Sequence, residues 1–396
     1  MIYLDNNATT KVDEKVLEAM MPYFKEEYAN PSSIYNFSKK ASNALKESRG
    51  VLKDFLNAKD EKEIIFTSCG SESANTAIKG VLNYNKAKKH IITTKVEHPC
   101  VLNLYQTLEK QGYKVDYIGV NSNGDLDLEQ LEAAINSDTA LVSVMWANNE
   151  TGVIFPIKKI SEIIKSKNPE TKFFVDAVQA AGKIPLDVQD MGIDMLGISG
   201  HKFHAPKGVG ALYVNSKTLI TPLIVGGHQE RGKRAGTENV PYIVGMAKAA
   251  ELAQDALKYE TTEVKRLRDK LETTLLKRIY NARLNTGVSN RVPNTTNIGF
   301  EYVEGELILL HMSDLGICAS SGSACTSGSL EPSHVLRAMN VPFTAIHGSI
   351  RFSLSRFTTE KEIDYVCEKM PEIIEKITAI SPYQDELAAL KALKTK

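Results

Sequence analysis

A lysine at the end of an apolar run is the residue of this sequence best placed for covalent chemistry. Lys202 follows the run MLGIS (195–199), separated from it by Gly200 and His201, and a second apolar run, GALYV, comes after it. An ammonium group is costly to bury between apolar strands, so a lysine in this position is able to lose its proton. A neutral amine can form a Schiff base with an aldehyde cofactor. A lysine in an ordinary loop at a strand end is an equally open interpretation of this segment.

Further polar residues follow other apolar runs, where parallel sheets bind their ligands. After EIIFTS come Gly70 and Ser71, whose backbone N–H groups and hydroxyl would bind a phosphate at a helix N-terminus. An ordinary serine N-cap is the alternative. His98 follows IITTKVE and would supply either a ring that stacks on a ligand or a helix cap. Asn149 follows LVSVMWA in the segment NNETG, which by itself indicates only a turn.

A carboxylate ends the most aromatic of these runs. Asp176 closes KFFVD, and Gln179 follows it by three residues. A carboxylate in such surroundings needs a cationic partner or several donors, and a protonated pyridine nitrogen would satisfy it. Together the strand ends supply a phosphate cradle, a stacking ring, an amide, a carboxylate and a Schiff-base lysine. This set predicts pyridoxal 5′-phosphate, whose ring accepts electrons from the substrate Cα when its nitrogen stays protonated.

Two more candidates lie in the C-terminal part of the chain. Cys325 is surrounded by Gly, Ser and Thr in SSGSACTSGS (320–329), a composition that cannot pack a core, so we expect its thiol to be exposed. Arg351, in SIRFSLS, would bind a substrate α-carboxylate in bidentate fashion. An interdomain ion pair is the alternative, and it suits Arg356 better. The remaining cysteines are predicted to be structural: Cys69, Cys100, Cys318 and Cys367.

The composition is typical of a globular protein without a strongly charged partner. The chain has 396 residues, 42% hydrophobic and 24% charged, with 48 basic and 48 acidic side chains. This balance argues against direct binding to nucleic acid or to a membrane surface. The five cysteines show no paired CxxC spacing, so we predict no disulfide framework and no metal site. Because no apolar run approaches about 20 residues and no signal sequence is evident, we expect a cytoplasmic location.

The elements that must position these residues alternate along the chain. Strands are expected at 63–68, 90–96, 114–120, 140–147, 172–178 and 194–200, with helices at 13–28, after 71, after 99, and at 127–135 and 156–167. Apolar strands separated by amphipathic helices predict an α/β fold with a mainly parallel sheet covered on both faces.

The later part of the chain indicates a second, smaller domain. A polar, Gly-rich loop leads into a long helical region at about 242–280, and short strands and helices follow in an α+β pattern. We expect an N-terminal segment (1–14) that packs on the small domain, a large cofactor-binding domain (15–252) and a small C-terminal domain (253–396). The small domain would carry the cysteine loop (320–332).

Nearly the whole chain resembles one enzyme family. The chain is similar to the pyridoxal-phosphate-dependent cysteine desulfurases of the NifS/IscS group, within the class V aminotransferase-like enzymes of fold type I. The segments that carry the resemblance are YLDNNATT, NPSS, FTSCGSES, EHP, NNETG, VDAVQ, SGHKFHAPKGVGALYV, QERGKRAGTEN, RVPNT, SSGSACTSGSLEPSHVL and IRFSLSRFT. The loop around Cys325 is the most specific of them.

The resemblance implies a role for each matching position. Lys202 would hold the cofactor aldehyde, His98 would stack on the ring and shuttle protons, and Asp176 would pair with the ring nitrogen. Arg351, with Asn149, would bind the substrate carboxylate, and Cys325 would attack the substrate sulfur. The other cofactor contacts implied are Asn149 and Gln179 at the ring hydroxyl, Gly70, Ser71, Ser199 and His201 at the phosphate, and Thr237 at the phosphate of a neighbouring subunit. The last of these implies a homodimer.

The reaction implied converts L-cysteine to L-alanine and leaves a persulfide on Cys325. A sulfur acceptor such as an iron–sulfur scaffold protein would then take the sulfur, and Cys325 would at most ligate an iron–sulfur cluster transiently. Aminotransfer and selenocysteine lysis are sibling reactions, and the loop cysteine argues against the first. A sulfur-delivery binding protein without catalysis is the remaining alternative, and it would lack the cofactor. Among the departures from the family pattern, Ser71 stands where Thr is frequent, and Tyr35 and Ser38 replace His and Gly.

Overall fold

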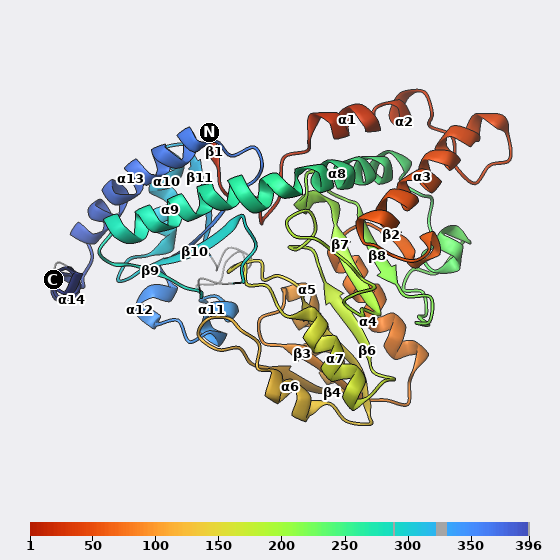
Figure 1. Cartoon of the computed structure of the whole chain (residues 1–396), viewed down its shortest axis with the longest axis horizontal. Coiled ribbons are helices and arrows are strands. Elements are labelled where there is room, and N and C mark those ends of the chain that lie inside the picture. The colour runs from red at the N-terminus through yellow and green to blue at the C-terminus, as the bar shows by residue number, and fades with distance from the viewer. Residues whose placement is uncertain (288–289, 322–330, 395–396) are drawn as a thin grey trace.

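A seven-stranded sheet forms the centre of the larger half of the molecule (Figure 1). The computed structural model describes residues 1–287, 290–321 and 331–394 and orders the strands β2-β8-β7-β6-β5-β3-β4. Their bounds are β2 Ile64–Thr67, β3 His90–Thr94, β4 Lys114–Ile118, β5 Thr139–Met145, β6 Lys172–Asp176, β7 Met195–Ser199 and β8 Gly210–Val214. Neighbouring strands are parallel except that β8 runs antiparallel to β2 and β7. The predicted α/β fold with a mainly parallel sheet is therefore confirmed.

Helices cover both faces of this sheet because successive residues of each strand point in opposite directions. On β6, Phe173 packs in a core with helices α3 (Lys39–Phe55), α7 (Ile157–Lys167) and α8 (Val240–Tyr259). Phe174, the next residue, packs in a second core with α4 (Gly70–Tyr84) and α5 (Pro99–Lys110). Strands buried on both faces explain the continuous apolar runs of the sequence. The short α6 (Leu128–Ala134) lies beside α7 on the first face.

A nearly continuous helix joins the two halves of the molecule. It consists of α8, the π-helical turn η5 (Glu260–Val264) and α9 (Lys265–Arg278), and Figure 1 shows it running along both halves. The helical region expected at about 242–280 thus begins two residues earlier, at Val240. The proposed domain limit at 252/253 falls inside α8 and remains a prediction.

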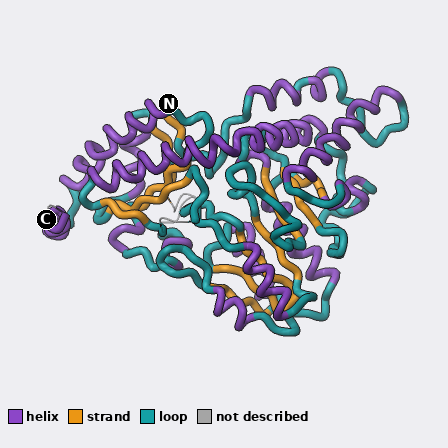
Figure 2. Tube along the Cα trace, viewed as in Figure 1, coloured by secondary structure: helices purple, strands orange, loops and turns teal. Residues whose placement is uncertain are grey.

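The smaller half contains an antiparallel sheet with the order β12-β13-β10-β9. These strands are β9 Ala282–Leu284, β10 Thr295–Phe300, β12 Ser320–Ser321 and β13 Ser349–Ser353. Helices α9, α10 (Gly305–Asp314) and α13 (Glu360–Ala379) share its apolar core, which also holds Leu4. Figure 2 shows helices and strands mixed in both halves. The N-terminal strand β1 (Ile2–Tyr3) pairs in parallel with β11 (Ile317–Cys318), so the chain begins beside the smaller half.

The remaining helices are short and lie mainly at the periphery. The helix expected at 13–28 is broken into α1 (Glu14–Met20) and α2 (Pro22–Lys25), because Pro22 cannot donate the hydrogen bond that would continue α1. The others are η1 Asn36–Ser38, η2 Glu61–Glu63, η3 Gly200–Lys202, η4 Gln229–Gly232, α11 His334–Ala338, α12 Phe343–Ile346 and α14 Gln384–Lys394. Within the described part of the chain, no helix has the length and apolar character needed to span a lipid bilayer.

Candidate active site

A cavity of about 420 Å³ opens where the parallel strands of the large sheet end. Because β3, β5, β6 and β7 run in the same direction, the polar residues that follow them meet at this edge. Ten of the residues singled out in the sequence line the cavity: Gly70, Ser71, His98, Asn149, Asp176, Gln179, Ser199, His201, Lys202 and Arg351. The strand-end pattern therefore located this site.

Lys202 ends the turn η3 directly after β7 and is half-buried. Its Nζ donates hydrogen bonds to the carbonyl oxygens of Asn7, at 2.6 Å, and Ala8, at 2.8 Å. Lys202 was interpreted either as a Schiff-base lysine or as an ordinary loop lysine. The structure favours the first interpretation, because it places the amine in a cavity.

Asp176 is the last residue of β6 and is buried beneath the cavity. Its Oδ1 accepts a hydrogen bond from the backbone N–H of Val178 at 2.9 Å. Burial raises the pKa of Asp176 to about 6, although the Val178 N–H and Lys202 act in the opposite direction. A cationic group inside the cavity would favour the ionised carboxylate, as the nitrogen of a protonated pyridine ring would.

His98 both caps a helix and lines the cavity. The two alternatives considered for it, a helix cap and a ring that stacks on a ligand, are therefore compatible. As the N-cap of α5, its Nδ1 accepts a hydrogen bond from the backbone N–H of Cys100 at 3.2 Å. Burial, with Lys202 and His334, lowers the pKa of His98 to about 4. At neutral pH the ring is therefore uncharged, and because Nδ1 is an acceptor, the proton lies on Nε2. Such a ring can stack on an aromatic ligand and exchange a proton with it.

Two buried oxygen atoms of the lining residues have no hydrogen-bond partner among the described residues. They are Asn149 Oδ1 and Ser199 Oγ. A buried polar atom without a partner is costly, so these atoms indicate where polar groups of a ligand would bind. Gln179 is already held, because its Nε2 donates to the Asn7 carbonyl oxygen at 3.0 Å.

The start of α4 has the geometry of a phosphate cradle. Gly70 is its first residue, and a Cβ there would lie 2.8 Å from Val178 Cγ2, so only glycine allows this close approach. The N–H groups at the start of this 15-residue helix and the exposed Ser71 hydroxyl suit an anion. Across the cavity, His201 Nδ1 lies 3.1 Å from Thr9 Oγ1. Burial, with Lys202 and Lys207, lowers the pKa of His201 to about 4.

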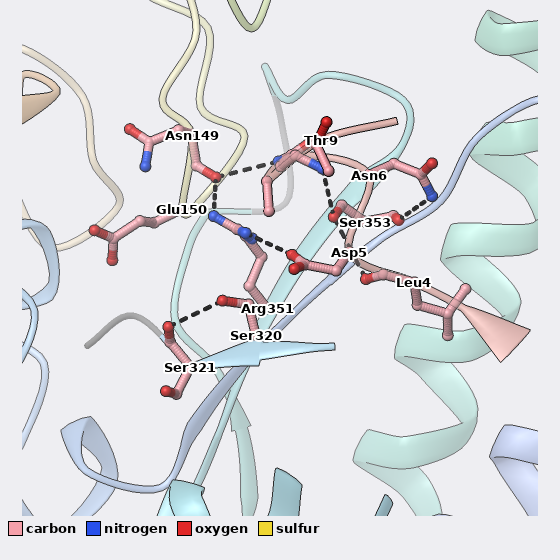
Figure 3. A network of polar contacts seen from close by, with 12 residues as sticks. Leu4, Asp5, Asn6, Thr9, Asn149, Glu150, Ser320, Ser321, Arg351 and Ser353 are labelled. Atoms are coloured by element: carbon pink, nitrogen blue, oxygen red, sulfur yellow. Dashed lines mark hydrogen bonds and ion pairs between the residues drawn. The ribbon is translucent and has the colours of Figure 1, made fainter. Parts of the chain in front are cut away.

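Arg351 reaches the cavity from the small half of the molecule. Its guanidinium on β13 is buried and forms an ion pair with Asp5 at 2.7 Å and a hydrogen bond to the Asn149 carbonyl oxygen at 3.0 Å (Figure 3). Its Nε has no hydrogen-bond partner among the described residues. A carboxylate in the cavity would supply one. Arg356, in contrast, pairs with Asp13 at 2.8 Å and does not line this cavity, as expected for a structural ion pair.

The Arg351→Lys variant tests the carboxylate site. We expect the KM for an amino-acid substrate to rise about tenfold, because an ammonium can keep the pair with Asp5 but cannot offer a second, fixed donor. Steady-state kinetics of the variant measures this. The same change at Arg356, outside the cavity, is the matched control and should leave KM unchanged. Equal KM values for Arg351→Lys and the unchanged protein would contradict the assignment.

Cys69 and Cys100, which were predicted to be structural, both line the cavity, and their structural role stays a prediction. They sit at the starts of α4 and α5, and these helix starts face the same edge of the sheet as the strand ends. Burial raises the pKa of the Cys100 thiol, which therefore stays protonated and is a poor nucleophile. Cys367 is buried in the small core, as predicted, whereas Cys318 is only half-buried on β11.

Sequence reasoning missed the contribution of the N-terminal segment. Asp5 pairs with Arg351, and Asn7 accepts hydrogen bonds from Lys202 and Gln179 through its carbonyl oxygen. The polar run DNNATT directly after an apolar start was the only local signal. The partners of Asp5 and Asn7 lie 172 to 346 positions away, so the pattern could not identify them.

One predicted residue lies away from the cavity of this chain. Thr237 is exposed and does not line it. The loop that carries Thr237 is tied to the start of α4, because Arg234 Nε donates to Glu72 Oε1 at 2.8 Å. Cys325 lies outside the described residues.

Comparisons with known proteins agree along nearly the whole chain. The aminotransferase class-V family model matches residues 2–366. A cysteine desulfurase of Nostoc sp. is 58% identical over 392 residues, which cover 98% of this chain and 96% of that protein. The solved structure of a NifS-like protein superposes with a TM-score of 0.89 at 41% identity, covering 94% of this chain and 99% of that one. SspA in complex with cysteine gives a TM-score of 0.79 at 36% identity, with 91% and 100% covered.

Proposed function

This chain belongs to the aminotransferase class-V family, and we propose that it is a cysteine desulfurase that depends on pyridoxal 5′-phosphate. The observation that carries the proposal is one cavity that gathers Lys202, Asp176 and Arg351, an amine, a buried carboxylate and a buried guanidinium from distant parts of the chain. The similar proteins support the substrate, because one is a cysteine desulfurase and another is a complex with cysteine.

Pyridoxal phosphate fits the residues that line the cavity. Asp176 would pair with the ring nitrogen, and the free oxygens of Asn149 and Ser199 would bond to polar groups of the cofactor. The start of α4 would receive the phosphate at the N–H groups of its first turn. When bound, the cofactor supplies an electron sink that stabilises negative charge at the substrate Cα.

The chain's own residues would carry out the remaining tasks. Arg351 orients the cysteine carboxylate, and the Lys202 amine removes the proton from Cα and returns a proton later in the cycle. Neutral His98 covers the ring and holds its transferable proton on Nε2. The Cys325 thiolate attacks the substrate sulfur, so that an S–S bond forms while the C–S bond breaks, and alanine leaves. The persulfide then passes its outer sulfur to an acceptor such as an iron–sulfur scaffold protein.

The direct test is an assay of products with L-cysteine and a thiol reductant. We expect alanine and sulfide in equal amounts, and a visible absorption band that shows the bound cofactor. Aminotransfer would instead require a keto acid and would release no sulfide. A binding protein without catalysis would lack the absorption band, and either result would refute the proposal. Pull-down with candidate scaffold proteins would identify the acceptor of the sulfur. We also propose that the enzyme is located in the cytoplasm.

A homodimer is the proposed assembly. Large apolar side chains are exposed before α3 and in the loop before η4, with Tyr28 at 69%, Ile34 at 101% and Val225 at 81% exposure. Exposed apolar residues of this size favour contact with another protein surface. Thr237, which is exposed in the loop after η4, would then reach the phosphate of the neighbouring subunit. Analytical ultracentrifugation should show a species of twice the chain mass, and a monomer at micromolar concentration would contradict the assembly.

A further inference from the structure

One buried amine near the cavity has no role in the reaction proposed above. Lys183 follows β6 by seven positions, and only 5% of it is exposed. Its Nζ donates to Gln179 Oε1 at 2.6 Å and lies 3.3 Å from Asn7 Oδ1. Burial of an amine without partners is costly, and both of its partners belong to residues that line the cavity.

The contact with Lys183 decides the orientation of the Gln179 carboxamide. An amide can rotate by half a turn and exchange its oxygen and nitrogen, but a donor on one side permits only the oxygen there. Nε2 of Gln179 is therefore directed to the other side, where it donates to the Asn7 carbonyl oxygen at 3.0 Å. The same oxygen accepts the hydrogen bond from Lys202 at 2.6 Å. Lys183 thus lies two hydrogen bonds away from the oxygen that holds the catalytic amine.

Buried charges surround Lys183 on the side away from the cavity. Glu260, the first residue of the π-helical turn η5, is 5% exposed, and its carboxylate accepts a hydrogen bond from the Arg356 backbone N–H. Lys183, Glu260 and Lys202 share the lining of a second, small cavity of about 10 Å³, which His204 also lines. π-Helical turns are frequent at functional sites, because they turn one side chain out of the regular helix pattern.

These charges act on one another. Burial, together with Lys202 and Arg351, lowers the pKa of Lys183 to about 7, although Glu260 acts in the opposite direction. Burial raises the pKa of Glu260 to about 7, opposed by Lys183 and Arg356. The charge on Lys183 therefore changes near neutral pH, within the same buried cluster as Lys202.

We propose that Lys183 is a positioning residue for the cofactor site: it fixes the Gln179 carboxamide with its nitrogen on the Asn7 carbonyl oxygen that also holds Lys202, and its charge, paired with Glu260, acts electrostatically on the Lys202 amine. The inference rests on the proposed function, from which it takes the cofactor. A lysine that only fills space in the fold would affect stability and nothing else.

The test uses Lys183→Met, which keeps the length of the side chain but removes both donor and charge. Removing a cation near Lys202 should raise the pH midpoint at which the visible band of the bound cofactor changes, by on the order of one unit. Cofactor affinity, measured by titrating the apoprotein with pyridoxal phosphate, should fall about tenfold. The matched control is Lys158→Met, since this lysine of α7 is exposed and pairs with Asp190 at 2.6 Å, away from the cavity. It should change neither quantity.

Two further variants separate the two parts of the proposal. Lys183→Gln keeps a donor for Gln179 Oε1 but no charge, so it should shift the pH midpoint while largely preserving cofactor affinity. In a Gln179→Ala background, Lys183→Met should lower cofactor affinity less than twofold further, because both changes act through one amide. Full additivity of the two losses would overturn the positioning route.

Thermal unfolding of the apoproteins provides the structural control. If Lys183→Met and Lys183→Gln lower the melting temperature but leave both midpoint and affinity unchanged, the inference is wrong. If Lys183→Met does not fold, Lys183→Gln alone tests the electrostatic effect of Lys183 on Lys202, through the pH midpoint of the visible cofactor band. Failure of the proposed function has a different signature, because the unaltered protein would then bind no cofactor and show no visible band.

Discussion

Lys202→Ala is expected to abolish cysteine desulfuration, with a fall in kcat of roughly 10⁴-fold or more. In the proposed mechanism this lysine would supply both the covalent attachment of the cofactor and the base that removes the Cα proton. It is placed for both tasks, because it lines the cavity with Asp176 and its Nζ is held at the carbonyl oxygens of Asn7 and Ala8. The visible band of the lysine-bound cofactor should disappear with the activity, which absorption spectroscopy of the purified variant would show.

The control for this variant is Lys207→Ala, a change at an exposed lysine of the same loop that does not line the cavity. It should retain both the band and the activity. Retention of the band by Lys202→Ala would show that another amine carries the cofactor and would remove the basis of the assignment. Because Lys183 is a buried amine close to the cavity, the double variant with Lys183→Met would then show whether that amine takes over.

Cys325→Ala is expected to keep the cofactor band but to lose the release of sulfide, whereas Lys202→Ala should lose both. The cofactor band should be normal, since the proposed cofactor contacts do not include Cys325, but sulfide release should fall by roughly 10³-fold or more because the proposed nucleophile is missing. Colorimetric sulfide and alanine assays over several turnovers would measure this. Cys318→Ala, at a half-buried cysteine on β11, is the matched control and should keep full activity.

The described residues on both sides of Cys325 support this expectation. Before it, Ser320 lines the cavity next to Arg351, its partner in the β12–β13 pairing. After it, Ser333 Oγ donates to Glu150 Oε2 at 2.5 Å, and His334 Nε2 lies 2.9 Å from the Glu97 carbonyl oxygen, one residue before His98. The described residues that precede and follow Cys325 in the sequence are thus held close to residues of the site. Full activity of Cys325→Ala would refute the persulfide step while leaving the cofactor assignment intact.

The large sheet and the strand-end residues were predictable because they depend on local rules. A strand buried on both faces must be apolar throughout, so β5 and β6 were visible as runs. Parallel strands share one carboxyl edge, so Asp176, Gln179 and Lys202 were expected to meet there, and all three line the cavity. The break between α1 and α2 was also encoded locally, but it was overlooked because the helical pattern continues through Pro22.

The sequence by itself therefore determined the kind of sheet, the edge at which chemistry occurs and, through its motifs, the family. Only the tertiary structure decided that Asp5 neutralises Arg351, that Asn7 holds Lys202, and that Lys183 lies behind Gln179. The physical reason is that periodicity reports which face of an element is buried but not which distant residue it meets. Contacts such as that between Asp5 and Arg351, 346 positions apart, exist only once both halves of the molecule have packed around the cavity.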